Sequence, residues 1–114
     1  MVKKYINLDF SDDELAKAVA DSPPPSGVVV SKLSTTVQAS APAEIFWHIC
    51  IEFGVQVSAF IVGSWIWEAA KKTGKNRARI NRQQIKLQKR EIVRLIQNEI
   101  AKYDERKAQE REDE

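Results

Sequence analysis

The stretch IFWHICIEFGVQVSAFIVGSWIW, residues 45–67, decides how the chain folds, because it is the longest apolar run in the sequence. Helix signals flank it on both sides. SAPAE, residues 40–44, combines a capping serine, a proline for a first turn and a glutamate for the positive end of the helix dipole. EAAKKTG, residues 68–74, supplies lysines and a glycine suited to a helix end. We therefore expect one long central helix over about residues 42–72.

The same stretch also carries the period of a β-strand. From Ile45 to Ser58 the odd-numbered positions are all apolar, and most even-numbered positions are polar or small. A strand of that length would greatly exceed the usual length of about five or six residues. Because the length and the flanking signals both favour a helix, we interpret the stretch as helical and keep the strand as the alternative.

A helix over residues 45–67 is long enough to cross a bilayer. Its 23 residues, at about 1.5 Å each, span roughly 34 Å against a hydrocarbon core of about 30 Å. Tryptophans lie near both ends, as is typical at the two headgroup levels, and the positive charge that follows predicts an N-out, C-in orientation and contact with anionic lipid head groups. The predicted membrane-interface anchors are Trp47, Trp65, Trp67, Lys71 and Lys72.

Polar side chains inside the stretch predict that this helix needs a partner. An ionised Glu52 near the bilayer centre costs up to about 3 kcal/mol. On a helix, His48, Glu52 and Gln56 lie on one side, and small residues continue that side and allow close approach of another helix. We therefore expect self-association along this stripe. The predicted oligomer interface consists of His48, Glu52, Gln56, Ala59, Gly63, Gly54 and Ser58.

A second interpretation stays open, in which the central helix is the buried core of a soluble, cytoplasmic homo-oligomer that serves as an interaction or adaptor protein. A helix that is apolar on nearly all sides must be covered, and copies of itself together with a C-terminal apolar stripe would cover it. The single cysteine, Cys50, cannot form an internal disulfide and fits a reducing compartment. We expect no cleavable signal peptide, because acidic residues interrupt residues 1–20.

The N-terminal segment predicts short elements separated by a spacer. Residues 4–10 suit a short strand or an extended lead-in equally well, and Ser11 opens a capping box for a helix over about residues 12–20. Three prolines at 23–25 end that helix and form a semi-rigid spacer. The β-branched residues within 28–38 favour a strand if a partner strand exists.

The C-terminal region predicts a basic amphipathic helix from about Lys89. Residues 78–87 suit either a tight hairpin or the start of this helix, and we favour the hairpin. Apolar residues then recur at three- and four-residue steps and form one stripe, which we expect to pack on the core or to bind a protein partner. The heptad pattern fails at Glu99 and Lys102, so no long coiled coil is expected. The predicted stripe consists of Ile92, Leu95, Ile96, Ile100 and Tyr103.

Positive charge is concentrated between Lys71 and Arg94, where ten basic residues accompany a single acid, Glu91. Such a stretch could neutralise several phosphates of a nucleic acid. The stretch holds no aromatic residue on which a base could stack, however, and basic residues beside an apolar segment are also explained by membrane topology. Nucleic-acid binding is therefore the weaker alternative.

Catalytic, metal and cofactor sites are not predicted. On a helix, His48 and Cys50 point in different directions and cannot form a dyad, and His48 with Glu52 gives only two metal ligands. The sequence predicts a mainly α, non-enzymatic protein with three regions, residues 1–41, 42–72 and 73–114. The favoured function is a single-span membrane protein that self-associates as a pore-forming or membrane-perturbing protein or as a subunit of a membrane complex.

Overall fold

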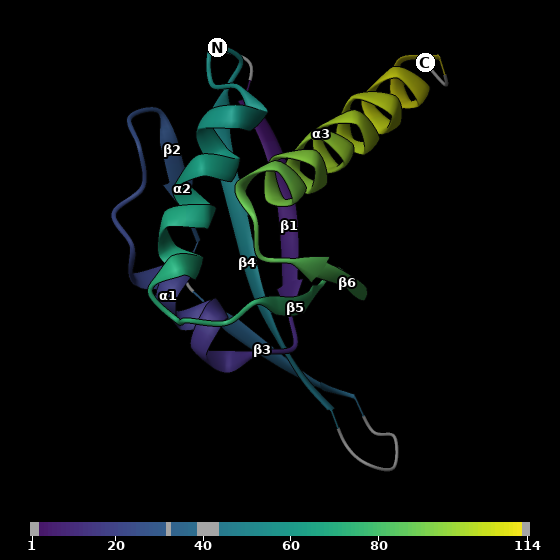
Figure 1. The fold of residues 1–114 in the computed structure, drawn as a ribbon. Helices are drawn as coiled ribbons and strands as arrows, with labels where there is room; N and C mark the ends of the chain where they lie inside the picture. Colours follow the sequence, from purple (N-terminus) through teal and green to yellow (C-terminus); the bar gives the residue numbers. More distant parts are fainter. Residues whose placement is uncertain (1–2, 32, 39–43, 113–114) are drawn as a thin grey trace.

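An antiparallel sheet of six strands forms the centre of the computed structural model, which describes residues 3–31, 33–38 and 44–112 (Figure 1). Three helices pack on one face of this sheet. The elements in chain order are β1 (Lys3–Phe10), α1 (Asp13–Asp21), β2 (Val28–Val30), β3 (Ser34–Gln38), β4 (Glu44–Gly54), α2 (Ala59–Lys71), β5 (Arg77–Ile80), β6 (Gln83–Lys86) and α3 (Lys89–Glu112).

The strand order is β2-β4-β1-β5-β6, and β3 pairs with β4 beyond the end of β2. β4 pairs with β1 along its other side, from Lys3 opposite Gly54 to Phe10 opposite Trp47. When β2 and β3 are counted together, the first part of the chain has the β-α-β-β-α-β arrangement of the split βαβ, or ferredoxin-like, motif. The strand β6 and the helix α3 are added to that motif at its C-terminal end.

The predicted mainly α fold is wrong, because the fold is α+β and the predicted central helix over residues 42–72 does not exist. Its first half is the strand β4 and its second half is the shorter helix α2. The alternation of apolar residues after Ile45 is therefore the period of a strand. Eleven residues can stay extended because β4 has strand partners on both sides. The expected start of the central helix at 40–43 lies outside the described residues.

The predicted membrane span is also wrong. Among the helices of the described ranges, none is long and apolar enough to cross a membrane. The apolar helix α2 has only 13 residues and packs one side, which includes Val62, Trp65 and Ile66, into the protein core. The functional interpretation as a single-span membrane protein therefore loses its basis, and so does the predicted orientation.

The core lies between the sheet and the helices. Alternate residues of β1 and β4 face the helices, which contribute one apolar stripe each. The chain itself thus covers most of the apolar stretch 45–67, although Ile45, Val55, Phe60 and Ile61 remain exposed. Large, fully buried residues of this core include Ile6, Leu8, Phe10, Leu15, Val19, Ile49, Ile51, Phe53, Ile66, Ile80, Ile92 and Ile96.

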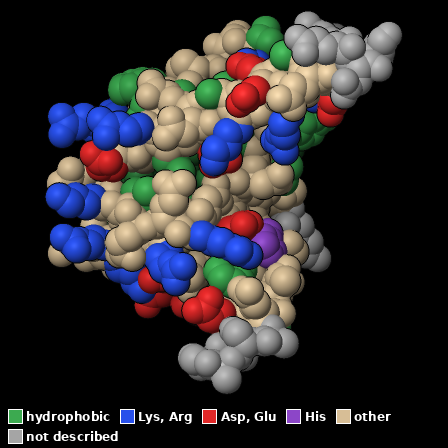
Figure 2. Space-filling model, turned by 90° about the vertical axis from the view of Figure 1, so that its right-hand side faces the viewer, with side chains coloured by type: hydrophobic (Ala, Val, Ile, Leu, Met, Phe, Trp, Pro, Cys, Tyr) green, Lys and Arg blue, Asp and Glu red, His purple; other side chains and the backbone are tan. Residues whose placement is uncertain are grey.

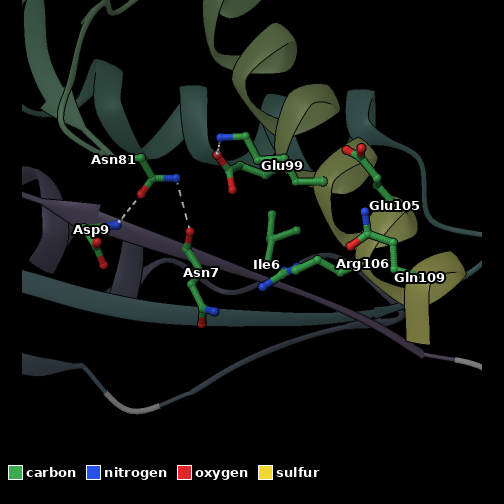
Figure 3. Close-up of a pocket in the computed structure, with 9 residues that line it drawn as sticks. Ile6, Asn7, Asp9, Asn81, Glu99, Glu105, Arg106 and Gln109 are labelled. Carbon is green, nitrogen blue, oxygen red and sulfur yellow. Dashed lines mark hydrogen bonds and ion pairs between the residues drawn. The ribbon is translucent and has the colours of Figure 1, made fainter. Parts of the chain in front are cut away.

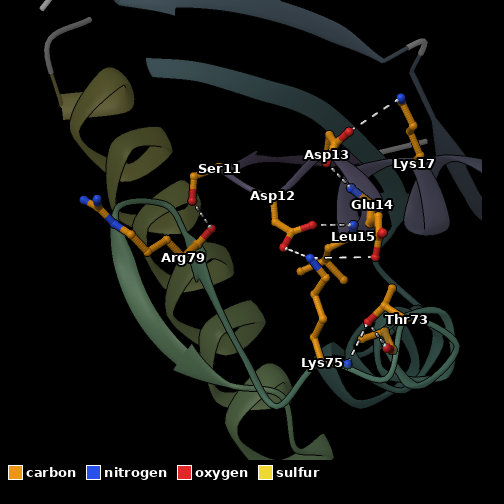
Figure 4. A network of polar contacts seen from close by, with 10 residues as sticks. Ser11, Asp12, Asp13, Glu14, Leu15, Lys17, Thr73, Lys75 and Arg79 are labelled. Atoms are coloured by element: carbon orange, nitrogen blue, oxygen red, sulfur yellow. Dashed lines mark hydrogen bonds and ion pairs between the residues drawn. The ribbon is translucent and has the colours of Figure 1, made fainter. Parts of the chain in front are cut away.

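The start of α1 is fixed by Asp12 rather than by the predicted cap Ser11. The Asp12 carboxylate accepts a hydrogen bond from the Leu15 amide at 3.0 Å and forms an ion pair with Lys75 (Figure 4). Burial by itself raises the pKa of Asp12, but the hydrogen bonds from Lys75 and Leu15 and the charge of Lys75 outweigh it, so the pKa lies below its ordinary value. The hydroxyl of Ser11 instead donates to the Arg79 carbonyl at 3.5 Å.

The lowered pKa of Asp12 predicts a pH-dependent stability. We expect Asp12→Asn, which keeps a capping side chain but removes the charge, to lower the free energy of unfolding near neutral pH. A carboxyl whose pKa is depressed by folding stabilises the fold above its unfolded pKa of about 3.9, and this contribution is lost as the pH falls through the folded pKa. Urea unfolding of both proteins over a pH series should show the difference shrinking below about pH 4. Asp13→Asn is the matched control, because Asp13 is exposed and 3.8 Å from Lys17; an equal effect there would contradict the assignment.

The hairpin favoured for residues 78–87 is present as β5 and β6. Its turn residues, Asn81 and Arg82, both have positive φ, at 53° and 64°, which is the geometry of a type I′ turn. The Asn81 side chain accepts from the Asp9 amide at 2.7 Å and donates to the Asn7 carbonyl at 3.2 Å. These contacts extend the pairing of the hairpin with β1, although the backbone register joins the two strands only at Phe10 opposite Ile80.

Candidate functional site

The sheet face opposite the core carries a polar cluster built from three strands. Because residues alternate along a strand, His48 and Cys50 of β4 lie on one face, and the register places Asp9 and Asn7 of β1 directly opposite them. On the other side of β4, Thr36 of β3 lies on the same face. Side chains alternate between the two faces of β4. The alternation that buries its apolar residues on one face therefore places its polar residues together on the other.

His48 links the three strands through its two ring nitrogens. Its Nδ1 lies 2.5 Å from Asp9 Oδ1, and its Nε2 lies 2.8 Å from Thr36 Oγ1. An ionised carboxylate only accepts hydrogen bonds, so Nδ1 donates to Asp9, while Nε2 forms the second hydrogen bond, with the Thr36 hydroxyl. Both His48 and Asp9 are about one-third exposed, so the cluster is accessible from one side.

A cavity of about 490 Å³ lies over this cluster. Its remaining lining includes Asn7, Ser31, Ser34 and Cys50. Burial, and to a smaller extent the charge of Glu52, raise the pKa of the Cys50 thiol. The thiol is therefore protonated at neutral pH and is a poor nucleophile, although His48 and Cys50 share a face that the predicted helix would not have given them.

The order carboxylate, imidazole and hydroxyl is also that of a nucleophilic triad, but acyl transfer needs further groups. It requires N–H donors aimed at the oxygen that becomes negative in the transition state. The neighbouring Cys50 amide is already used, because it donates to Ser31 Oγ at 2.9 Å. The cluster therefore suits cross-strand bonding and hydrogen bonding to a bound molecule better than it suits acyl transfer.

A second cavity, of about 530 Å³, lies between β1 and α3 (Figure 3). Asn81 and its contacts with β1 form one end, and charged residues of α3 form the other side. Three acids and two basic residues line it, so opposite charges nearly balance and no strong preference for a charged ligand results. The charged lining residues are Asp9, Glu99, Glu105, Lys102 and Arg106.

The hairpin of β3 and β4 projects from the body of the protein as an arm (Figure 1). All five residues of β3 are exposed, and in the described part of the chain no strand pairs with its outer edge. Val37 and Ile45 lie opposite each other on the arm and are 62% and 48% exposed. Residues 33–43 contain no charged residue, so this edge lacks the charges that normally protect an edge strand from pairing.

The structure does not bring the predicted interface residues together in one stripe. His48 and Glu52 lie on the polar sheet face, where Glu52 forms an ion pair with Lys3 at 3.1 Å. Gly54 ends β4, Gln56 lies in the following turn, and Ser58 caps α2 by accepting from the Ile61 amide at 3.3 Å.

The last two predicted interface residues, Ala59 and Gly63, lie on α2. Gly63 does serve close helix approach, but to α3 of the same chain: a Cβ at this position would lie 2.8 Å from the Cα of Val93. The four-residue spacing of the predicted interface residues therefore does not place them on one side of a helix, because these residues are divided between a strand, a turn and a helix.

The predicted membrane-interface anchors are likewise dispersed. Trp65 is buried in the core, and Trp47 and Trp67 are partly buried and pack against it. The ammonium groups of Lys17 and Lys71 lie 5.2 Å and 5.7 Å from the ring centroids of Trp47 and Trp67. Lys71 and Lys72 are exposed at the end of α2.

The predicted stripe of α3 is used within the chain. Ile92, Leu95 and Ile96 are buried in the core, and Ile100 packs against it. Tyr103 donates from its hydroxyl to the Lys3 carbonyl at 3.1 Å and packs its ring on Tyr5.

Figure 2 shows one face of the molecule on which many Lys and Arg side chains gather, with some Asp and Glu side chains among them. In the basic stretch over residues 71–94, Lys71, Lys75 and Arg94 form ion pairs with acidic residues, and the other seven basic residues form none with the described residues. Most of the positive charge of residues 71–94 is therefore not neutralised by acidic residues in the described part of the chain.

Sequence reasoning missed Asp9, Thr36 and Asn81, which reach the polar face from separate parts of the chain. The alternation of Tyr5, Asn7 and Asp9 within the first strand is the signal that could have indicated Asp9. Fold and site together define a small α+β protein with a split βαβ sheet, a polar open face and an uncovered edge strand. Comparisons with protein-family models, curated protein sequences and solved structures gave no match.

Proposed function

We propose that this chain is a small non-enzymatic interaction module that pairs with a second copy of itself through the outer edge of β3. The observation that carries the proposal is the exposed, uncharged edge of this strand. Edge strands present a row of N–H and C=O groups that another strand can bind, and native proteins normally block such pairing with charges, prolines or bulges. β3 contains none of these charges or prolines.

The side chains of the arm support the same pairing. Val37 and Ile45 are exposed although both are apolar and β-branched, which suits a surface that a further strand would cover. Two antiparallel β3 strands related by a two-fold axis would present the same surface to each other, as an isologous dimer requires. The self-association expected from the sequence is thus kept as a proposal, but its surface is a sheet edge instead of a central helix.

Sedimentation velocity over a concentration series tests this proposal. We expect the chain to pass from monomer to dimer as the concentration rises, and Val37→Lys to weaken dimerisation at least about tenfold, because a desolvated or repelling charge at the strand edge costs more than about 1.4 kcal/mol. Val55→Lys is the matched control, since Val55 is 63% exposed and lies in the turn after β4, at the opposite end of β4 from β3. A wild-type chain that stays monomeric throughout, or an equal loss in both variants, would refute pairing through β3.

A further inference from the structure

A groove at the crossing of α2 and α3 combines an apolar floor with a basic rim. It has a volume of about 450 Å³ and is lined by Phe60 of α2 and by Val93, Gln97 and three basic residues of α3. Phe60 is 57% exposed, which is unusual for so large an apolar side chain. The basic lining residues are Lys89, Arg90 and Arg94.

The floor of the groove follows from the close approach of the two helices. Gly63 lets α2 approach the backbone of Val93, so Phe60, three residues before Gly63, lies beside the first turns of α3. The Lys89 ammonium lies 4.7 Å from the centroid of the Phe60 ring. One apolar side chain of a partner can therefore enter the space beside Phe60 and Val93 while the cations remain at the rim.

The charge of the rim selects an acidic partner. Lys89 and Arg90 form no ion pair within the described ranges, and Arg94 has only a 3.9 Å contact with Glu91. Complementary charge favours association and rejects partners of the same sign. The chain's own acidic end does not fit as the anchor, because residues after Tyr103 include no large apolar side chain.

Nucleic acid fits this groove less well than a peptide does. Single-stranded nucleic acid is held by stacking of its bases on open aromatic faces, and here the Lys89 ammonium lies over Phe60, the one aromatic residue that lines the groove. A concave space also suits a single inserted side chain better than a membrane surface, which is contacted by protruding apolar groups.

We propose that this groove binds an acidic peptide segment of another protein, with one large apolar side chain of the segment inserted between Phe60 and Val93. Carboxylates on either side of that anchor would pair with Lys89, Arg90 and Arg94. Because β3 lies on a different edge of the molecule, this binding does not depend on the proposed self-pairing. The two surfaces together would let a dimer hold two acidic partners.

Fluorescence anisotropy with a synthetic peptide tests the proposal. The probe is a short fluorescein-labelled peptide with a Phe-Leu pair flanked on both sides by Glu residues, and the control probe replaces each Glu by Lys. We expect the acidic probe alone to bind. The double variant Lys89→Glu/Arg90→Glu should weaken binding more than tenfold, and Phe60→Ala should weaken it several-fold, since Phe60 is exposed and its loss should not disturb folding.

The matched control is Arg77→Glu/Arg79→Glu, which changes the net charge equally on exposed positions of β5. It should retain binding within about twofold, and so should Val37→Lys. Equal losses in the two double variants would show that only the overall charge matters and would overturn the site. Tighter binding of a single-stranded oligonucleotide or of anionic lipid vesicles than of the acidic probe, dependent on Phe60, would also overturn it.

Discussion

Alanine substitutions on β4 should cause large losses of stability where the side chain is buried in the core and a small loss at the exposed end of the strand. We expect Ile49→Ala and Ile51→Ala to lower the free energy of unfolding by about 2–5 kcal/mol each, and Phe53→Ala by about 3–5 kcal/mol. These side chains are at most 1% exposed and face the helices. Each substitution removes apolar contacts and leaves a cavity that the packed core cannot fully close.

Ile45→Ala provides the matched control, because it is the same chemical change on the same strand at a position 48% exposed. Its loss should stay below about 1 kcal/mol, as is usual for surface positions. Urea unfolding followed by tryptophan fluorescence, at a concentration where the chain is monomeric, measures all four. Losses of similar size at Ile45, Ile49 and Phe53, with a minor loss at Ile51, would instead indicate a helical period and contradict the strand.

The alternation at 45–58 shows why the sequence led to a wrong prediction of a helix where the structure has the strand β4. The alternation was visible, but a strand of 11 residues is stable only with strand partners on both sides, and β1, the partner on one side, comes from a distant part of the chain. Local signals such as EAAKKTG at 68–74 correctly indicated a helix end, but that helix begins only at Ala59. One apolar run thus contains a strand, a turn and a helix.

Elements whose signals are local were predicted more accurately. The acidic residues after Phe10 do begin a helix, although Asp12 caps it in place of Ser11. The three- and four-residue spacing after Lys89 does mark an amphipathic helix. The hairpin of β5 and β6 is closed by its own turn residues, so it too depends on neighbours in sequence.

The candidate site was largely beyond prediction because its geometry depends on strand register. Asp9 and His48 are 39 residues apart in sequence and meet only because β1 and β4 pair in one particular alignment. A shift of one residue would move every side chain to the other face. His48 and Glu52 were predicted as interface residues because of their spacing on a helix. That spacing gives no indication that Asp9 or Thr36 lies beside His48.

Gly63→Ala should lower the free energy of unfolding by about 1–3 kcal/mol, the usual cost of overpacking a tight interior. Alanine is favoured over glycine within a helix by about 1 kcal/mol, but a Cβ here would lie 2.7 Å from Val93 Cγ2 and 2.8 Å from Val93 Cα. The side-chain contact can move, whereas the backbone contact can be relieved only by moving α3 away from α2. That shift would also loosen the buried residues of α3 from the core.

Ser64→Ala is the control for this effect, since it introduces the same residue one position later in α2. Ser64 Oγ is buried without a hydrogen-bond partner among the described residues, so its removal should be neutral or slightly stabilising. Adding Val93→Ala to Gly63→Ala should restore only part of the loss, because the contact with Val93 Cα remains. Full restoration, measured by thermal unfolding of the single and double variants, would show that the side chain alone limits the approach. Partial restoration would show that the backbones of α2 and α3 limit how closely the two helices approach. The separation of these backbones also sets the width of the groove beside Phe60.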